Sequence, residues 1–392
     1  MDVQAEQRER IMGEKLRVGV IFGGRSGEHE VSIASAASVL EALDSDKYEV
    51  VPIGITDEGH WLAGVDPQPL LQGATMEDAV QSGQATAVTM TGDPTSNGLV
   101  PVESPDDDPE AGGMHPQRPL DIVIPVLHGT YGEDGTLQGL LEMAGVAYAG
   151  CGVLGAALGM DKDASKMVFR SAGLPIVDWL TIRRVDFERD PESVCARIVE
   201  RFPGAVFVKP ANMGSSVGVG KAHNAAELPG VVADALKYDR KAIVEPAVNC
   251  RELECGVLGN DEPIASVVGE IVPSNEFYDY QAKYIDNASR LYIPAEIPPE
   301  TADELRAMAV KAFLALDLSG LARVDFFLDR DSGQLYLNEV NTMPGFTQIS
   351  MYPKLWEASG IPYPQLLDRL IQLGMERHAE KQRNRTHYSP AE

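Results

Sequence analysis

An apolar run at residues 16–22 that ends in Gly23 and Gly24 constrains the fold more than any other feature of this sequence. Such a run is typical of a buried strand in a parallel sheet, where both faces are covered and the chain leaves through a loop. Further along, the sequence shows a helical pattern at 31–43, strands at 48–56 and 120–127, and a helix at 135–144. Strands that alternate with helices predict a doubly wound α/β domain over residues 1–150.

The stretch at residues 57–119 interrupts this alternation. It is rich in Gly, Pro, Asp and Thr and contains the run DDDP at 106–109. We expect an insertion that is partly mobile, although its length is uncommon for a bare loop.

The pattern changes after Gly150, where short strands and helices follow one another. A helix at 155–173 opens a small α+β domain at 151–248, and a third domain follows at 249–392. Strands are expected at 176–182, 205–210, 242–248, 252–258, 264–271, 321–328 and 334–340, and helices at 191–202, 227–237, 303–316 and 363–375. The charged tail from Arg377 is expected to be frayed.

Composition narrows the class of partner. The formal net charge of −26 disfavours nucleic acid and an anionic membrane surface, because both repel an acidic body. The longest apolar runs are strand-sized, residues 1–15 show no signal-peptide core, and the 4 cysteines form no C-x-x-C pair. We therefore expect a cytoplasmic enzyme.

The most informative segment is a predicted hairpin at residues 322–341. Strand alternation places Arg323 and Asp325 on one face, and Glu339 and Asn341 on one face of the partner strand. Two carboxylates and an amide oxygen suit Mg²⁺, which prefers hard oxygen ligands and retains water and phosphate oxygens. A solvated hairpin face is the alternative, and the apolar residues of the opposite face argue against it.

The segment at 207–221 is an apolar strand followed by a loop rich in glycine and hydroxyl groups. Backbone amides of such a loop can approach phosphate oxygens, and Lys209 adds a compensating charge. The loop is not a Walker A motif, because Lys221 is followed by alanine. The next strand carries Glu245, which could meet an adenine or a ribose. The segment therefore predicts a nucleotide site, with a plain hairpin turn as the alternative.

Two loops follow predicted strands at the sheet edge where open α/β sheets bind ligands. One loop, at 23–30, contains Glu28, and the other, at 126–135, contains His128. Both side chains could face one pocket, although a single Glu or His in a loop is more often solvated.

Two further patterns favour other functions. The spacing G-x-G-x-x-G at 150–155, with Asp178 further on, matches a nicotinamide-dinucleotide fingerprint, but helix entry with tight packing explains it equally well. A calcium loop beginning at Asp329 is the weaker interpretation, because its twelfth position is Val340 instead of the required glutamate.

Six separated segments occur in a characteristic order. They are GGRSGEHEVS at 23–32, LHGTYGEDG at 127–135, MDK at 160–162, GSSVG at 214–218, FYDYQAKY at 277–284 and NEVNTMPG at 338–345. Together they resemble the D-alanine–D-alanine ligase family, over residues from about 16 to 375. The resemblance implies a three-domain ATP-grasp fold, α/β and α+β, in which two domains after the N-terminal one hold ATP between them.

The resemblance also implies an activity, the ATP-dependent ligation of two D-alanine molecules for peptidoglycan precursor synthesis. ATP would phosphorylate the carboxylate of the first D-alanine, and the amine of the second would attack the acyl phosphate. Two Mg²⁺ (or Mn²⁺) ions would be held by Asp325, Glu339 and Asn341. Arg323 and the Gly345 amide would stabilise the oxyanion.

The remaining implied site residues fall into two groups. ATP would contact Lys162, Lys209, Gly214, Ser216, Val217, Glu245, Ala247 and Glu252. D-Alanine would contact Glu28 and His128 in the first subsite and Lys283, Ser350 and Met351 in the second, with Ser215 and Tyr284 linked to Glu28 by hydrogen bonds. The segment at 273–291 would form a lid that excludes water.

Some features depart from the family pattern or leave alternatives open. Pro246 occupies a position where some members carry a lysine beside the adenine, and the 57–119 insertion is longer than in the shortest members. A sibling ligase that makes D-alanyl-D-lactate or D-alanyl-D-serine is one alternative, for which Tyr284 is the discriminating residue. An inactive nucleotide-binding module is another, and the retained metal-ligand positions argue against it. Family analogy suggests a homodimer.

Overall fold

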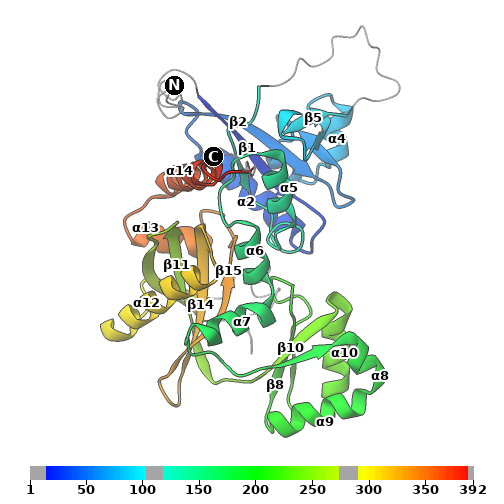
Figure 1. Cartoon of the computed structure of the whole chain (residues 1–392), viewed down its shortest axis with the longest axis vertical. Helices are drawn as coiled ribbons and strands as arrows, with labels where there is room; N and C mark the ends of the chain where they lie inside the picture. The colour runs from blue at the N-terminus through cyan, green and yellow to red at the C-terminus, as the bar shows by residue number, and fades with distance from the viewer. Residues whose placement is uncertain (1–14, 97, 103–117, 273–289, 387–392) are drawn as a thin grey trace, which may run out of the picture.

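The computed structural model describes residues 15–96, 98–102, 118–272 and 290–386. Three sheets organise them (Figure 1). The N-terminal sheet lies at one end of the molecule, the C-terminal sheet lies beside it, and the central sheet lies at the other end. The expected mixture of α/β and α+β structure is confirmed.

The N-terminal sheet has the strand order β5-β4-β3-β2-β1-β6. β1 (Leu16–Gly23) pairs in parallel with β2 (Tyr48–Ile55) on one side and with β6 (Ile122–Pro125) on the other. Strands were predicted at these three places, but their order in the sheet was not. The helices α2 (His29–Ala42) and α5 (Thr136–Ala144) follow β1 and β6. The loops that leave these two parallel strands therefore meet at one edge of the sheet.

Over its described part, the expected insertion at 57–119 is a folded extension of this sheet, with strands and helices that the sequence analysis did not predict. Three short antiparallel strands, β3 (Trp61–Ala63), β4 (Thr86–Met90) and β5 (Leu99–Pro101), extend the sheet beyond β2. The helices α3 (Pro67–Leu70), α4 (Met76–Gln81) and η1 (Pro94–Ser96) connect them. Strands this short show too little alternation to be detected in a sequence. Residues 103–117 lie outside the described part.

The central sheet is antiparallel and has the order β7-β10-β8-β9. Its strands are β7 (Leu180–Arg183), β8 (Val206–Pro210), β9 (Gly220–Ala222) and β10 (Lys241–Pro246). The helices α8 (Arg184–Arg189), α9 (Pro191–Arg201) and α10 (Leu228–Tyr238) pack on it, and α8 was not predicted. Ile198, Val232 and Val244 are among the side chains that form its core.

The C-terminal sheet has the order β13-β12-β11-β14-β15. Its strands are β11 (Cys250–Gly259), β12 (Ile264–Val272), β13 (Arg290–Tyr292), β14 (Gly320–Asp329) and β15 (Leu335–Asn341). Cys255 and Val257 pack with Phe313 of α12 (Pro299–Ala315), whereas a side chain on Gly256 would meet Trp356 of α13 (Met351–Ala358). α12 and the unpredicted α13 therefore cover opposite faces.

The helix expected at 155–173 is two helices, α6 (Val153–Met160) and α7 (Lys162–Ser171). Asp161 separates them with an extended backbone (ψ 101°), and its carboxylate accepts hydrogen bonds from the amides of Asp163 and Ala164. A side chain that caps a helix in this way ends one helical run and begins the next. Lys162 consequently stands at the first turn of α7, facing the central sheet.

The tail is ordered further than expected. α14 (Tyr363–Gln382) continues past Arg377, whose guanidinium lies 4.0 Å from the centre of the Tyr148 ring. Arg377 also donates to the Tyr148 carbonyl at 3.2 Å, so α14 is tied to the N-terminal domain. The expectation of fraying from Arg377 onward is wrong for residues 377–382.

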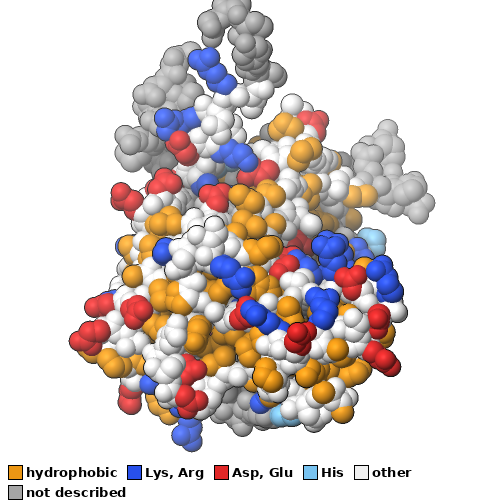
Figure 2. All heavy atoms as spheres, turned by 60° about the horizontal axis from the view of Figure 1, so that its bottom comes forward, with side chains coloured by type: hydrophobic (Ala, Val, Ile, Leu, Met, Phe, Trp, Pro, Cys, Tyr) orange, Lys and Arg blue, Asp and Glu red, His pale blue; other side chains and the backbone are white. Residues whose placement is uncertain are grey.

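Charge and apolar surface are unevenly spread. On the face in Figure 2, basic and acidic side chains are interspersed, and Lys and Arg gather towards one side despite the net charge of −26. An acidic chain can therefore still offer locally positive surface to an anionic ligand. In the described ranges, no helix combines the length and the apolar character needed to cross a membrane.

Candidate active site

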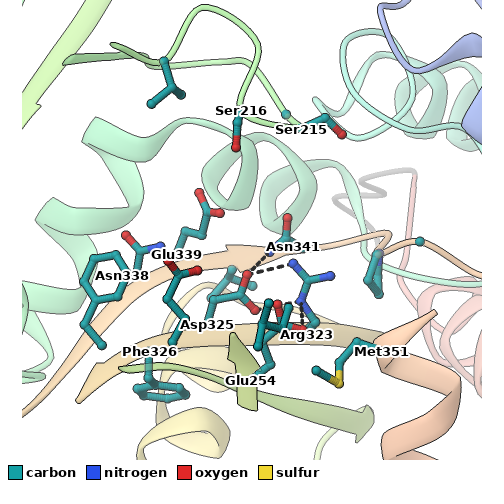
Figure 3. Close-up of a pocket in the computed structure, with 18 of the residues that line it drawn as sticks. Ser215, Ser216, Glu254, Arg323, Asp325, Phe326, Asn338, Glu339, Asn341 and Met351 are labelled. Atoms are coloured by element: carbon teal, nitrogen blue, oxygen red, sulfur yellow. Dashed lines mark hydrogen bonds and ion pairs between the residues drawn. The ribbon is translucent and has the colours of Figure 1, made fainter. Parts of the chain in front are cut away.

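One large cavity, about 1530 Å³ in volume, is lined by residues of the central and C-terminal sheets, of α2 and of the loops that follow β1 and β6. In Figure 3, Ser215 and Ser216 of the glycine-rich loop lie on one side, and the β14–β15 hairpin lies on the other. The cavity thus brings together segments that the sequence analysis selected independently.

The hairpin brings together the two faces that strand alternation predicts. Arg323 lies opposite Asn341, and Asp325 lies opposite Glu339. The Arg323 guanidinium donates twice to Asp325, at 2.7 and 2.8 Å, and lies 2.9 Å from a carboxylate oxygen of Glu254. Burial opposes this charge, but the two carboxylates outweigh it and raise the pKa of Arg323 well above its usual value. Arg323 is therefore a permanent cation directed at the cavity.

The same face offers oxygen ligands for a metal. Asp325 accepts a hydrogen bond from the Asn341 amide at 2.9 Å, and Glu339 lies 3.4 Å from the Lys162 ammonium. Among the described residues, no group of three or more acidic, histidine or cysteine side chains could hold a metal by itself. Two carboxylates and an amide oxygen fit Mg²⁺ only if phosphate oxygens or water complete its shell. The donor set thus matches a metal that arrives with a nucleotide.

Lysine side chains lie in the part of the cavity where phosphate binding is expected. Lys209 Nζ lies 2.7 Å from one carboxylate oxygen of Glu245, and Lys166 pairs with the other oxygen. Burial alone would raise the pKa of Glu245, but the two lysines outweigh it and lower the pKa to about 2. Lys162 donates to the Met213 carbonyl at 2.8 Å, next to the glycine-rich loop.

Sequence reasoning missed Lys166, Glu254, Glu133 and Ser35. Lys166 follows Lys162 by four positions and so shares its helix face, and Glu254 follows Glu252 by two and so shares its strand face. These spacings are signals that could have found the first two. Glu133 lies within the 127–135 motif, whereas nothing local distinguishes Ser35.

Most of the other expected nucleotide residues line the cavity. Gly214, Ser216, Ala247 and Glu252 are among them. Val217 does not line the cavity, and its side chain lies towards the loop that contains Gly27. Ser215 and Ser216 have positive φ angles of 48° and 58°, an uncommon conformation for residues with a side chain.

Glu28 lies where the glycine-rich loop meets the loop after β1. Ser215 donates a hydrogen bond to its carboxylate, as the resemblance implied. A Cβ added to Gly129 or to Gly214 would come within 2.7 or 2.5 Å of a Glu28 oxygen, so both positions require glycine for this approach. Three loops therefore converge on one buried carboxylate.

His128 and Glu133 lie beside Glu28 but bind other protein groups. The two ring nitrogens of His128 lie 3.0 Å from Ser35 Oγ and 3.0 Å from the Met343 carbonyl. Burial lowers the pKa of His128 and raises that of Glu133 to about 8, with Glu28 adding to the rise at Glu133. Both nitrogens of His128 are thus engaged within the protein, although its ring lines the cavity.

The expected second subsite is partly described. Gly345, Ser350 and Met351 line the cavity at the start of α13. Ser350 Oγ accepts from the Thr347 amide at 3.1 Å. Lys283, Tyr284 and residues 273–289 of the expected lid lie outside the described part of the chain.

The two patterns that favoured other functions have local structural roles. Gly152 is the N-cap of α6, and a Cβ on Gly155 would come within 2.7 Å of the Asp317 carbonyl. Asp178 pairs with Arg170 and Arg201 on the surface. Asp329 accepts from two amides of its own turn. Packing and turn formation account for both patterns.

Three sheets around one cavity, with a glycine-rich loop facing a carboxylate hairpin, define an ATP-dependent ligase of the ATP-grasp type. Family models described as "D-ala D-ala ligase N-terminus" and "D-ala D-ala ligase C-terminus" match residues 17–151 and 168–372. The chain belongs to the D-alanine–D-alanine ligase family.

Individual relatives agree over nearly the whole length. The D-alanine–D-alanine ligase of Acetivibrio thermocellus is 51% identical, covering 94% of this chain and 98% of its own, and that of Heliobacterium modesticaldum is 50% identical, covering 96% and 99%. Among solved structures, the D-alanine-D-alanine ligase from Coxiella burnetii is 37% identical with a TM-score of 0.81, covering 95% of this chain and 97% of its own. The VanG D-Ala:D-Ser ligase from Enterococcus faecalis is 36% identical with a TM-score of 0.80, covering 92% and 100%.

Proposed function

We propose that this chain joins two D-alanine molecules into D-alanyl-D-alanine at the expense of ATP, supplying a peptidoglycan precursor. One observation carries the proposal beyond family membership. A single cavity contains a buried carboxylate suited to an ammonium group, Glu28, and an arginine–carboxylate hairpin suited to phosphoryl and acyl transfer, centred on Arg323.

The reaction has two steps. A carboxylate oxygen of the first D-alanine attacks the γ-phosphorus of ATP, the bond from phosphorus to the ADP oxygen breaks, and ADP leaves. The amine of the second D-alanine then attacks the carbonyl carbon of the acyl phosphate. The carbon–oxygen bond to phosphate breaks, the amine gives up a proton, and phosphate leaves.

The chain's own residues position and neutralise charge in these steps. Arg323 and the Gly345 amide would stabilise the oxyanion of the tetrahedral intermediate. Lys162 and Lys209 would contact the ATP phosphates. Glu28, held by Ser215, would bind the first ammonium.

A divalent cation completes this assignment. Asp325, Glu339 and Asn341 would hold two Mg²⁺ or Mn²⁺ ions, which neutralise phosphate charge when bound. The oxygen donors of these three side chains support the proposal. The Lys162 ammonium lies 3.4 Å from Glu339, so a positive charge partly balances the carboxylates of this region.

The remaining roles concern recognition and organisation. Glu245, Ala247, Glu252 and the loop residues Gly214, Ser216 and Val217 would contact the nucleotide. His128, Lys283, Ser350, Met351 and Tyr284 would contact or enclose D-alanine. We also propose domains at 1–150, 151–248 and 249–392, each built around one of the three sheets, a cytoplasmic location and a homodimer.

Product analysis tests the proposal. The purified chain is incubated with ATP, MgCl₂ and a panel of D- and L-amino and hydroxy acids, and products are resolved by mass. We expect D-alanyl-D-alanine, ADP and phosphate in equal amounts, and loss of activity with a chelator that Mg²⁺ or Mn²⁺ reverses. D-Alanyl-D-serine or D-alanyl-D-lactate as the main product would replace this assignment with that of a sibling ligase.

A further inference from the structure

The backbone that follows β15 is held by side chains of the N-terminal domain. The Met343 amide donates to Glu133 at 3.0 Å, and the Met343 carbonyl lies 3.0 Å from His128 Nδ1. Glu133 also accepts from the Gly129 amide at 2.9 Å, which fixes its carboxylate. The amide and the carbonyl of Met343 are therefore both held by hydrogen bonds to side chains of the N-terminal domain.

A second anchor lies three residues further along. The Phe346 amide donates to Ser35 Oγ at 3.3 Å, and the same oxygen lies 3.0 Å from His128 Nε2. The Phe346 carbonyl accepts from the Tyr363 hydroxyl at 2.6 Å. Gly345 lies between the two anchored residues, so its amide direction is set by them.

The hydrogen-bond pattern defines the state of the His128 ring. A carbonyl can only accept, so Nδ1 carries the proton that is donated to Met343. Ser35 Oγ accepts from Phe346 and can donate its own proton to Nε2. Burial lowers the pKa of His128, in agreement with a neutral ring. The three side chains of Ser35, His128 and Glu133 thus form one buried network.

We infer that Ser35, His128 and Glu133 are positioning residues that hold the Gly345 amide in place for the oxyanion formed in the second step. The inference rests on the proposed function. It assigns to the N-terminal domain a part in organising a catalytic group of the C-terminal domain, and it gives His128 a role through Met343.

Physical reasoning supports an effect on rate. A hydrogen-bond donor stabilises an oxyanion only when it points at the position where charge develops. Displacement of a reacting or stabilising group by about 1 Å can cost about 10²-fold in rate. Gly345 has no side chain through which the protein could hold it, so the anchors at Met343 and Phe346 carry that task.

The network also lies next to the first subsite. Ser26 Oγ donates to the His128 carbonyl at 2.8 Å, and Gly129 packs against Glu28. Occupation of the first subsite and alignment of the Gly345 amide therefore depend on the same loop.

Single substitutions test the inference. Ser35→Ala removes one anchor with little change in volume, Glu133→Gln replaces one acceptor by a donor, and His128→Ala removes the contact to Met343. His128→Asn is the conservative variant, because its amide can still donate to the Met343 carbonyl. Ser32→Ala is the matched control: Ser32 is equally buried on α2, and its hydroxyl accepts from the Gly23 amide and donates to the Val126 carbonyl, both in the N-terminal domain.

Two readouts separate positioning from folding. Dipeptide formation reports both steps, and scrambling of an oxygen isotope out of the β–γ bridge of ATP in the presence of D-alanine reports the first step. We expect dipeptide formation to fall about 10- to 100-fold in Ser35→Ala, Glu133→Gln and His128→Ala, with smaller losses in His128→Asn. At saturating D-alanine, scrambling and the KM for ATP should stay within about threefold of the wild type in Ser35→Ala and Glu133→Gln. Because His128 also lines the proposed first subsite, its variants are compared by dipeptide formation alone. Ser32→Ala should lose stability without a comparable loss of rate.

Other outcomes overturn the inference. Unchanged dipeptide formation in all three variants, or scrambling that falls in parallel with it in Ser35→Ala and Glu133→Gln, would show that these residues do not act through the Gly345 amide. An equal loss of rate in Ser32→Ala would assign the effect to stability. If the wild-type chain shows scrambling but forms no dipeptide, the proposed function fails instead.

Discussion

Lys166 of α7 and Glu245 of β10 form an ion pair whose side chains are only 2% and 3% exposed. Lys209 binds the other oxygen of the same carboxylate at 2.7 Å. α7 packs with the C-terminal sheet through Phe169, whereas Glu245 and Lys209 belong to the central sheet. The shared carboxylate therefore ties together the two parts of the chain between which we propose that ATP binds.

The pKa values of the two lysines are shifted in opposite directions, although burial opposes the positive charge of both. Burial lowers the pKa of Lys166 in spite of Glu245. At Lys209 burial also opposes the charge, but Glu245 and Glu339 outweigh it and raise the pKa. The charge of Lys209, the proposed phosphate ligand, is thus the better stabilised of the two.

The first prediction concerns Lys166→Met. Removing one partner of a buried ion pair leaves a charge without compensation and costs about 3–5 kcal/mol; because Lys209 remains, we expect about 3 kcal/mol. The KM for ATP should rise, since Lys209 then interacts more strongly with Glu245. Urea unfolding and initial rates measure both effects.

Two controls accompany this variant. Lys237→Met removes an exposed lysine that pairs with Asp234, and it should leave the melting temperature unchanged. Lys166→Met combined with Glu245→Gln should lose less stability than the sum of the two single losses, because the two side chains belong to one ion pair. A stable Lys166→Met protein would contradict the buried pair.

The second prediction concerns acid stability. The pKa of Glu245 is lowered from 4.5 to about 2 in the folded chain, so its contribution is complete above pH 4.5 and is lost as pH falls towards 2. A shift of this size corresponds to about 3 kcal/mol. The stability difference between wild type and Glu245→Gln, from urea unfolding at several pH values, should therefore shrink as the solution becomes more acidic. A difference that is constant from pH 6 to 3 would exclude this linkage.

The third prediction concerns the metal site. Glu339→Gln retains the shape but removes a negative charge, and we expect turnover to fall at least about 10³-fold with little change in melting temperature. Asp331→Asn, in the exposed turn of the same hairpin, is the control and should remain active. Near-normal turnover of Glu339→Gln at ordinary Mg²⁺ concentrations would remove Glu339 from the metal site.

The fourth prediction concerns the first subsite. If Glu28 binds the ammonium of the first D-alanine, Glu28→Gln should raise the KM for that subsite about tenfold or more, because a hydrogen bond to a charged group is worth about 1.5–3 kcal/mol. The KM for ATP should change much less. Glu41→Gln, at an exposed position on the same helix, serves as the control. Equal changes for D-alanine and ATP would place Glu28 outside the subsite.

The fifth prediction concerns the choice of second substrate and a residue outside the described ranges. Tyr284 is expected to join the hydrogen bond between Ser215 and Glu28, and a site with polar partners can distinguish an amine from a hydroxyl. We expect Tyr284→Phe to gain D-alanyl-D-lactate synthesis with nearly unchanged affinity for ATP. Competition between equal amounts of D-alanine and D-lactate, resolved by mass, measures the ratio; an unchanged ratio would refute the role of Tyr284.

Local periodicity determined a large part of this structure. The parallel strand at β1, and the shared strand faces of Arg323 with Asp325 and of Glu339 with Asn341, follow from apolar runs and from the two-residue repeat of strands, which a sequence displays directly. The same reasoning failed at residues 57–119, where strands of three to five residues are too short to show a repeat. It also missed the break at Asp161, because a single capping side chain decides it.

The sequence by itself identified the segments to which we assign the chemistry: the glycine-rich loop, the carboxylate hairpin and the loops with Glu28 and His128. Only the tertiary structure decided which of their atoms meet. Ser215 binds Glu28 across 187 positions of sequence, and Glu133 binds the Met343 amide across 210. Contacts of this range depend on how three separate sheets pack, and packing also sets the burial that shifts the pKa of Glu133 and Glu245. A local sequence repeat contains no information about long-range contacts or about burial, because it specifies the conformation of one helix or strand and not what packs against it.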